Sequence, residues 1–222
     1  MNTLWLEISP GLAARFPGLR ALTIRMEDVE VHRESVELEA FKIEVTENAR
    51  GRWTLDQLRE HPRFRAYRDF FWRVGVDPTK IRPASEALLR RVLRGRRLPR
   101  INTFVDVYNL ASIETAIPLA AFDENGLSGS LLMREASEGE VFLGIGMEKP
   151  VILGGGEPVI EDGEKLVAIY PYRDAEACKI TQATQDVQLL ICGVPNIDER
   201  VLSDAGKVAV DWIIEFCGGI PA

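Results

Sequence analysis

The pattern of the chain changes at Pro118, and this change constrains the fold more than any other feature. Before Pro118 most apolar residues recur at helical spacing. After it, short apolar runs alternate with turn sequences such as Asp123-Glu124-Asn125-Gly126 and Glu161-Asp162-Gly163. Regular turn signals between short runs are typical of antiparallel or mixed sheets that bend towards a barrel. We therefore predict an α+β fold with mixed β-sheets forming a barrel-like core flanked by helices.

The predicted helices lie mainly in the first half of the chain. The clearest has Phe64, Tyr67 and Phe70 on one face, begins near Pro62 and stops at Gly75. The last helix shows the same apolar periodicity without any residue suited to chemistry, so we interpret it as an amphipathic packing helix. Helices are predicted over residues 36–45, 62–74, 86–94, 104–115 and 201–216.

Turn residues and capping patterns set the predicted boundaries. Gly51 is expected to follow the first helix, and Thr103 with Asp106 has the spacing of a capping box at the fourth. The run 154–156 of three glycines is predicted to be a hairpin turn. With no repeat or linker, residues 1–222 are predicted to form a single domain, with a looser part over 1–82 and a core over 83–222. Strands are predicted over residues 3–8, 19–31, 119–122, 130–134, 141–143, 151–153, 166–170, 178–181 and 187–192.

Composition excludes several classes of protein. No apolar run approaches the roughly 20 residues needed to cross a bilayer, so no membrane partner is expected. The N-terminal sequence lacks the basic start and apolar segment of a signal peptide, and we expect a cytoplasmic protein. The 3 cysteines have no CxxC spacing, and neither His32 nor His61 is near one in sequence. We therefore predict buried reduced thiols, no structural metal and no cofactor.

Charge is distributed unevenly along the chain. The net charge is -7, yet residues 50–100 contain 15 Lys and Arg against 5 Asp and Glu. A concentrated basic segment can attract a polyanion locally. The alternative is that these arginines are solvated or paired with acids elsewhere, since cations also stabilise a helix C-terminus. The candidate RNA-binding residues are Arg90, Arg91, Arg94, Arg96 and Arg97.

The segment 100–123 is predicted to form one wall of a pocket, because polar residues alternate there with apolar ones. Two arginine–carboxylate neighbours, Arg134-Glu135 and Arg173-Asp174, stand at predicted strand ends. Arginine can bind a carboxylate or phosphate bidentately, and a carboxylate can bind an amino group. The alternative for each pair is a partly exposed ion pair. The candidate substrate-binding residues are Arg100, Asn102, Asn109, Glu114, Arg134, Arg173, Asp174 and Thr184.

The same segment resembles the B3/B4 editing domain of the bacterial phenylalanyl-tRNA synthetase β subunit. That family has an Arg-x-Asn start, then Val-Asp-Val-x-Asn, a glutamate and Pro-Leu-His-Ala-Phe-Asp. This chain has Arg100, Asn102, Val105-Asp106-Val107, Asn109, Glu114 and Pro118-Leu119-Ala120-Ala121-Phe122-Asp123 at those places. The resemblance covers about residues 81–194, and the whole length is similar to free-standing members. It implies mixed sheets in a barrel-like core and a pocket that hydrolyses the ester of a wrongly attached tyrosine on tRNA.

Several positions differ from the family pattern. Ala120 stands where the family has histidine, Ile117 replaces a glutamine, and Leu190 aligns near a strand glutamate. Tyr108 replaces a threonine and should narrow the pocket. The groups that position the hydrolytic water in the synthetase are thus absent, although the tRNA ribose hydroxyl can still assist hydrolysis.

These features support three hypotheses for function. The first is a tRNA-binding, free-standing editing factor that hydrolyses a misacylated tRNA, an aminoacyl-tRNA deacylase with no ligase activity of its own. The second is a non-catalytic module or sensor for a small amino-acid-like ligand. The third is tRNA binding without chemistry. The expected partners are tRNA or aminoacyl-tRNA, with no DNA, and we prefer an RNA-linked function.

Overall fold

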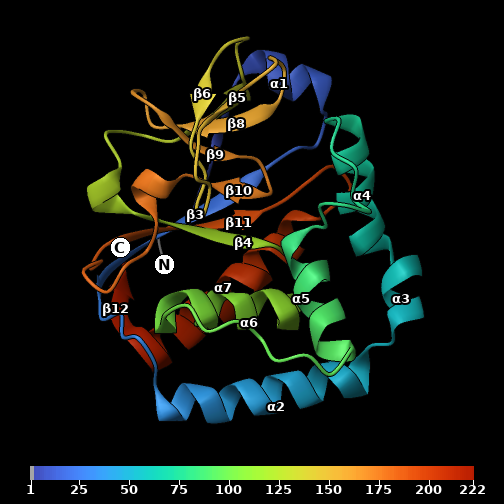
Figure 1. The fold of residues 1–222 in the computed structure, drawn as a ribbon, viewed down its shortest axis with the longest axis vertical. Helices are drawn as coiled ribbons and strands as arrows, with labels where there is room; N and C mark the ends of the chain where they lie inside the picture. The colour runs from blue at the N-terminus through green and yellow to red at the C-terminus, as the bar shows by residue number, and fades with distance from the viewer. Residues whose placement is uncertain (1–2) are drawn as a thin grey trace.

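The computed structural model describes residues 3–222, which form three β-sheets and seven α-helices (Figure 1). The α+β prediction is confirmed, but the predicted barrel-like closure is wrong for this part of the chain. Each of the two larger sheets keeps two free edges, and the two strands of the third sheet pair only with each other. Many strands after Pro118 have only two to four residues. They distribute among separate sheets and do not continue one ladder around an axis.

The longest strand, β3 (Ala21–Val29), organises the antiparallel central sheet. Its alternating sequence buries Leu22, Ile24 and Met26 on one face. One edge of β3 pairs with β1 (Thr3–Trp5) and β12 (Gly218–Pro221). The other edge pairs with β11 (Val187–Cys192), which also pairs with β4 (Leu119–Asp123). Strands predicted over 19–31, 119–122 and 187–192 are therefore confirmed.

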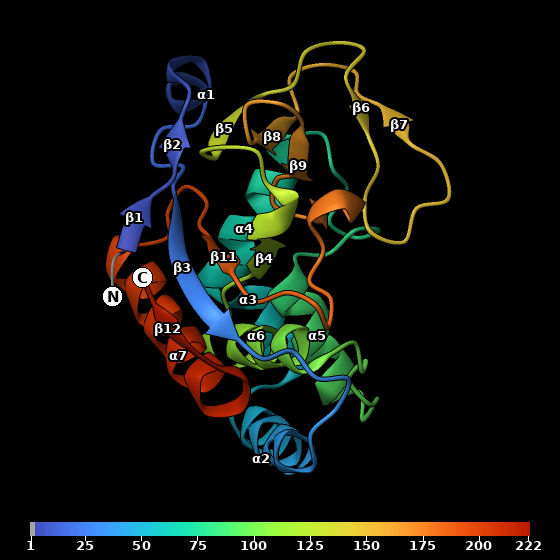
Figure 2. The same cartoon turned by 90° about the vertical axis from the view of Figure 1, so that its left-hand side faces the viewer.

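A second, mixed sheet, the upper sheet, faces the central sheet. Its strand order is β10 (Arg173–Asp174), β9 (Leu166–Ile169), β8 (Pro158–Glu161), β5 (Leu132–Glu135) and β2 (Glu7–Ile8). Only the β2–β5 pair is parallel. The third sheet is a hairpin of β6 (Val141–Phe142) and β7 (Val151–Ile152), which projects from the body in Figure 2. The glycine run 154–156 follows this hairpin and leads to β8, so it joins two sheets and is not a hairpin turn.

Six of the helices cover the opposite face of the central sheet and one side of the molecule, whereas the helix Pro10–Arg15 lies beside β5 of the upper sheet (Figure 1). The amphipathic helix α7 (Glu199–Cys217) packs on the central sheet, as predicted. A Cβ atom on Gly206 would lie 2.9 Å from Cδ1 of Ile24, so α7 approaches the sheet closely at this glycine. Helix α6 (Thr103–Thr115) lies against α7, and α2 (Val36–Arg52) lies against α6. The side is formed by α3 (Leu55–Glu60), α4 (Pro62–Arg73) and α5 (Ala84–Leu93).

Two predicted helix ends differ from the structure, at the start of α6 and the end of α2, while the predicted start of α4 near Pro62 is confirmed. The cap of α6 is Asn102, whose side chain accepts the Val105 N–H at 2.9 Å, one residue before the predicted Thr103. Helix α2 continues through Gly51, because one glycine in a last turn costs only about 1 kcal/mol. His61 caps α4 by accepting the Arg63 N–H on Nδ1 at 3.3 Å.

Some elements were not predicted. Helix α1 (Pro10–Arg15) follows the strand predicted over 3–8, and Ser9 acts as its N-cap. The strand predicted over 178–181 is wrong. A 3₁₀ turn (Glu176–Cys178) stands there, and the Thr181 N–H donates to the Thr184 hydroxyl at 2.9 Å. Such local side-chain bonds compete with strand pairing. The other unpredicted elements are α3, β8, β10 and β12.

The predicted burial of the three cysteines is confirmed. Cys178, Cys192 and Cys217 are buried and form no disulfide. Within residues 3–222 no helix has the length and apolarity to cross a bilayer. In the same residues no group of three or more His, Cys, Asp and Glu side chains could hold a metal ion.

The turn between β8 and β9 depends on Asp162, whose side chain is buried. Burial alone would raise the pKa of this carboxyl, but hydrogen bonds from Lys165 and three backbone N–H groups lower it to about 2. The folded pKa therefore lies below the unfolded value of 3.8. A depressed carboxyl pKa contributes stability above the unfolded pKa and loses it as the pH falls towards the folded pKa.

We expect Asp162 to contribute about 2 kcal/mol above pH 4 and to lose it between about pH 4 and pH 2. Urea unfolding between pH 2 and pH 6 measures this contribution. Asp162→Asn should flatten that part of the profile, whereas Asp204→Asn, on the exposed face of α7, should leave it unchanged. Identical pH profiles for wild type and Asp162→Asn would contradict the assignment.

Candidate functional site

A small cavity lies between the central sheet and the upper sheet. Two cross-strand pairs face each other across it: Ala120 with Leu190 on β4 and β11, and Ala168 with Asp174 on β9 and β10. Its volume is about 80 Å³. Pockets for drug-sized ligands begin at roughly 300 Å³, so this cavity accommodates only a small group. The remaining lining residues are Ala84, Leu119, Ile169, Tyr170, Pro171, Tyr172 and Cys192.

Strand alternation explains which side chains reach the cavity. In β11 the side chains of Leu190 and Cys192 point to the upper sheet, since they alternate with Leu189 and Ile191. Leu189 pairs with Ile24, whose side chain contacts α7. Both faces of β11 are therefore buried, which agrees with its nearly continuous apolar sequence.

Asp174 is the acidic residue of the cavity. Burial raises the pKa of its carboxyl to about 7, although the neighbouring Arg173 guanidinium acts in the opposite direction. Tyr108 on α6 faces the same region, and burial together with the Asp174 charge raises its pKa. A carboxyl that titrates near neutrality can bind a cation or exchange a proton with a bound water.

The other polar groups of the cavity are already used by the fold. The Tyr170 hydroxyl donates to the Gly193 carbonyl, and the Tyr67 hydroxyl from α4 donates to the Cys192 carbonyl. Burial raises the pKa of both phenols and of the Cys192 thiol. These groups are therefore neutral near pH 7, and Asp174 is the group of this cavity that can carry charge.

Three predicted substrate-binding residues lie at or near the N-terminal part of α6, outside the cavity lining. Arg100 pairs with Glu39 of α2 at 2.7 Å on the surface. Asn102 caps α6 and donates to the Ile180 carbonyl at 3.2 Å, so its amide is committed to the fold. Asn109 is half-buried in the middle of α6. The structure does not bring these three side chains together.

Glu114 and Thr184 also have partners within the protein. Glu114 accepts two hydrogen bonds, of 2.8 and 2.6 Å, from the Arg52 guanidinium. The Thr184 hydroxyl donates to the Asp123 carboxylate at 2.6 Å and thereby joins the end of β4 to the segment before β11. Glu114 therefore joins α6 to α2, and both residues act as structural contacts.

The two predicted arginine–carboxylate neighbours have different surroundings. The Arg134 guanidinium pairs with Glu140 at 2.6 Å and with Glu161 at 2.5 Å. Arg173 is exposed and donates to the Ile145 carbonyl at 3.3 Å. Neither arginine lines the cavity, within the part of the chain that the structure describes. Of the eight predicted substrate-binding residues, Asp174 alone does.

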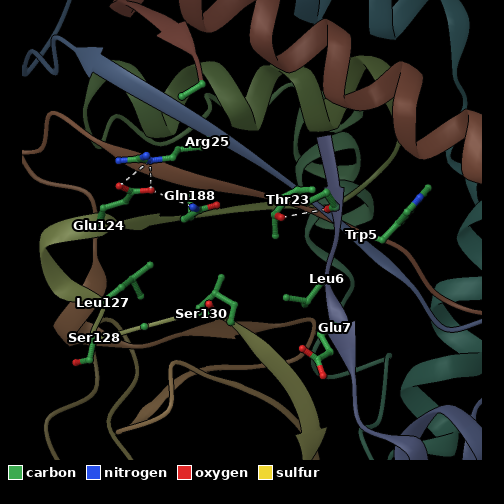
Figure 3. A pocket seen from close by; sticks show the side chains of 14 residues that line it. Trp5, Leu6, Glu7, Thr23, Arg25, Glu124, Leu127, Ser128, Ser130 and Gln188 are labelled. Atoms are coloured by element: carbon green, nitrogen blue, oxygen red, sulfur yellow. Dashed lines mark hydrogen bonds and ion pairs between the residues drawn. The ribbon is translucent and has the colours of Figure 1, made fainter. Parts of the chain in front are cut away.

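A larger groove of about 670 Å³ lies on the same face of the central sheet, beside β1 and the 127–131 loop. Figure 3 shows Arg25, Glu124 and Gln188 pointing toward one another in it. Arg25 Nε donates to both Glu124 carboxylate oxygens at 2.8 and 3.0 Å, and Gln188 donates to the same carboxylate at 2.9 Å. This cluster satisfies its own hydrogen bonds, so the groove is a weaker candidate site.

The exposed arginines in and after the last turn of α5 form a surface that we call the basic face. Four of the five predicted RNA-binding arginines are exposed here: Arg91, Arg94, Arg96 and Arg97. Among the described residues no carboxylate oxygen lies within 4.0 Å of their guanidinium nitrogens. The alternative that acids of the other half neutralise this segment therefore does not apply to these four.

Arg90 differs from its neighbours. Its Nε lies 2.7 Å from Glu86 Oε1, and the other oxygen of Glu86 lies 3.0 Å from Arg68 of α4. Glu86 is buried between these two arginines. Arg90 therefore joins α5 to α4 through a shared carboxylate.

Sequence reasoning missed most of the cavity wall. Ala168 and Tyr170 lie on a predicted strand but carry no polar signal, and Cys192 was interpreted only as a buried thiol. The departures at Ala120 and Leu190 were the informative signal, because these two residues are direct cross-strand neighbours in the cavity.

The fold and the cavity define an α+β protein with a small site enclosed between two facing sheets. The B3/4 domain model matches residues 66–218, more than half of the chain. The chain therefore belongs to the B3/4 domain family.

Curated relatives are phenylalanine–tRNA ligase beta subunits. The chain is 23% identical over 167 residues to that of Neisseria gonorrhoeae, covering 65% of this chain and 21% of the relative. It is 36% identical over 107 residues to that of Geobacter metallireducens, covering 47% and 13%. The chain thus spans about a fifth or less of the length of these relatives.

A solved structure shows the same fold. The N-terminal fragment of the phenylalanyl-tRNA synthetase beta subunit from Pyrococcus horikoshii matches with a TM-score of 0.50 at 12% identity. The match covers 96% of this chain and 49% of that fragment.

Proposed function

We propose that this chain binds tRNA through the basic face and hydrolyses the ester of a misacylated tRNA in trans, in the cytoplasm. The observation that carries the proposal is the row of exposed arginines without carboxylate partners on an otherwise acidic chain. The likeness to synthetase beta subunits supports tRNA as the partner. The proposal includes no ligase activity and no DNA binding.

The shape of the basic face supports a long polyanionic partner. Three hollows of about 600, 400 and 530 Å³ adjoin one another along it. Arg96 lines the first and second, while Arg82 and Arg90 line the second and third. Spaced cations along a continuous surface match the regular phosphates of an RNA backbone.

The cavity supports the second part of the proposal, which is the hydrolysis of an aminoacyl ester. The resemblance implies a histidine and a glutamate at Ala120 and Leu190, and the chain has two apolar side chains there. Asp174 is the group of the cavity that can carry charge near neutrality, and it binds the aminoacyl group. In this proposal the ribose hydroxyl of the tRNA, which is supplied by the substrate, assists the hydrolysis of the ester.

We expect purified protein to release the amino acid from at least one member of a panel of mischarged tRNAs. Release of labelled amino acid, measured against spontaneous hydrolysis, tests this expectation. If folded protein binds tRNA but hydrolyses no member of the panel, the hydrolytic part of the proposal is wrong. If it also fails to bind tRNA at low salt, the whole proposal is wrong.

A second candidate function is a non-catalytic module or sensor for an amino-acid-like ligand, favoured by the apolar pair at Ala120 and Leu190. Such a ligand at 100 times its dissociation constant should raise the free energy of unfolding by about 2.7 kcal/mol. A thermal-shift screen of free amino acids measures this effect. The sensor function requires a response to a free amino acid in a protein that hydrolyses no mischarged tRNA.

A further inference from the structure

The walls of the cavity are rigid and close together. Tyr170 is held by its hydrogen bond to the Gly193 carbonyl and packs edge-on against Phe70, with ring centroids 6.3 Å apart. Leu190 is 1% exposed and fixed in the middle of β11. At about 80 Å³ the space is well below the roughly 150 Å³ of a cavity that holds a benzene ring. A tyrosyl or phenylalanyl side chain exceeds that space.

The carboxyl of Asp174 has no partner of its own in residues 3–222. No hydrogen bond or ion pair joins it to a protein donor, and the adjacent Arg173 guanidinium is directed to the Ile145 carbonyl instead. The side chain is half-buried and lines the cavity, so its carboxyl can accept hydrogen bonds from a ligand that enters there. A ligand that brings N–H donors would supply what the fold leaves out.

The charge of the cavity also restricts the ligand. Within the described chain no Lys or Arg lines it, so a free carboxylate would be desolvated there without a counter-charge. An ester or amide carbonyl has no such cost. The cavity therefore suits an amino compound whose carboxyl group is esterified better than a free amino acid.

We propose that the cavity binds a small aliphatic α-aminoacyl group, such as alanyl or glycyl, with its ammonium held by Asp174. The inference rests on the proposed function and names the substrate class of that site. Ala120, Leu190 and Ala168 contact the aliphatic side chain, and Tyr170 excludes larger ones. The ester carbonyl lies at the mouth, where the tRNA end enters.

The dependence of binding on pH follows from the groups that face Asp174. These are Tyr108 from α6, Cys192 from β11 and Cys178 beside β10, all with raised pKa values and neutral near pH 7, and the cation Arg173. Binding an ammonium requires the ionised Asp174, whose pKa is about 7. Affinity should therefore rise through pH 7 and fall again where the α-amino group loses its proton, at about pH 8.

Three amides test the inference without tRNA. L-alaninamide has the ammonium and the small side chain, propionamide lacks the amine, and L-tyrosinamide has the amine with a large side chain. Titration followed by NMR should show binding of L-alaninamide and at least tenfold weaker binding of the other two. Equal binding of propionamide, tighter binding of L-tyrosinamide, or no binding of L-alaninamide would overturn the inference.

Two variants locate the binding. Asp174→Asn keeps the shape of the side chain and should weaken L-alaninamide binding about tenfold or more. The matched change Asp204→Asn on exposed α7 should have no effect. Leu190→Ala enlarges the cavity and should raise the affinity for L-tyrosinamide, which provides a gain that misfolding cannot produce. Unchanged L-alaninamide affinity in Asp174→Asn would show that the assignment is wrong.

The outcomes separate this inference from the proposed function. Binding of L-alaninamide in a protein that hydrolyses no mischarged tRNA supports the substrate class and contradicts hydrolysis. Hydrolysis of tyrosyl-tRNA without any binding of L-alaninamide supports the function and overturns the substrate class.

Discussion

A loss of most affinity for tRNA is expected from the quadruple variant Arg91→Gln, Arg94→Gln, Arg96→Gln and Arg97→Gln. Each exposed guanidinium that contacts a phosphate releases counterions, so the affinity falls as salt rises. Removal of four such contacts should lower the slope of log affinity against log salt by about 3, at about 0.7 to 0.9 per contact. Filter binding or fluorescence anisotropy between 50 and 200 mM salt measures both quantities.

The control must remove the same charge elsewhere. The variant Lys149→Gln, Lys179→Gln, Arg200→Gln and Lys207→Gln has the same net charge and leaves the basic face intact. It should keep the salt slope of the wild type. Equal loss in both quadruple variants would mean that tRNA responds to net charge alone, and unchanged affinity in the first would remove the basic face from the proposal.

Arg90 is expected to contribute to stability and not to tRNA binding, although the sequence analysis placed it with the other four candidate RNA-binding arginines. A row of arginines at a helix end shows where positive charge gathers, but not which members have partners. Arg90 and Arg94 follow one another at helical spacing, and only Arg90 reaches Glu86. The partner of Glu86 is Arg68, 18 residues earlier and on another helix. Only the ion pair between Arg68 of α4 and Glu86 of α5 separates the structural arginine from the exposed ones.

Two residues of the cavity wall could be predicted from the sequence, but the side chain that reaches into the cavity could not. The resemblance directed attention to Ala120 and Leu190, and strand pairing places them side by side. Asp174 was a candidate because of its neighbour Arg173, yet the structure separates the two: the carboxyl faces the cavity and the guanidinium faces the hairpin. Successive residues of a strand point to opposite faces, so adjacent sequence positions seldom share a site.

The fold also contains elements that local sequence patterns do not predict. Period and turn signals located β3, β11, α4 and α7 within a few residues, because each buries a regular apolar face. Strands of two residues such as β2 and β10 have no such period, and they form because neighbouring strands offer a free edge. The predicted barrel failed for the same reason, since the closure of a sheet depends on registers that no single strand encodes.

Glu86→Ala is expected to produce the largest loss of stability, about 3 kcal/mol or more. The change leaves Arg68 and Arg90 without their shared counter-charge at the contact between α4 and α5, and breaking a buried pair costs about 3–5 kcal/mol. Single domains have a free energy of unfolding of about 5–15 kcal/mol, so this is a severe loss. Urea unfolding should show a lower midpoint at an unchanged m value.

The matched control is Glu114→Ala, which removes the partner of Arg52. Both side chains of that pair are about a third exposed or more, so the loss should stay below about 1 kcal/mol. Glu86→Gln keeps one acceptor in place and should lie between the two. If Glu86→Ala proved as mild as Glu114→Ala, the shared carboxylate would be no support for the α4–α5 contact. If Glu86→Ala instead changed the affinity for tRNA without a loss of stability, Arg90 would belong among the phosphate contacts.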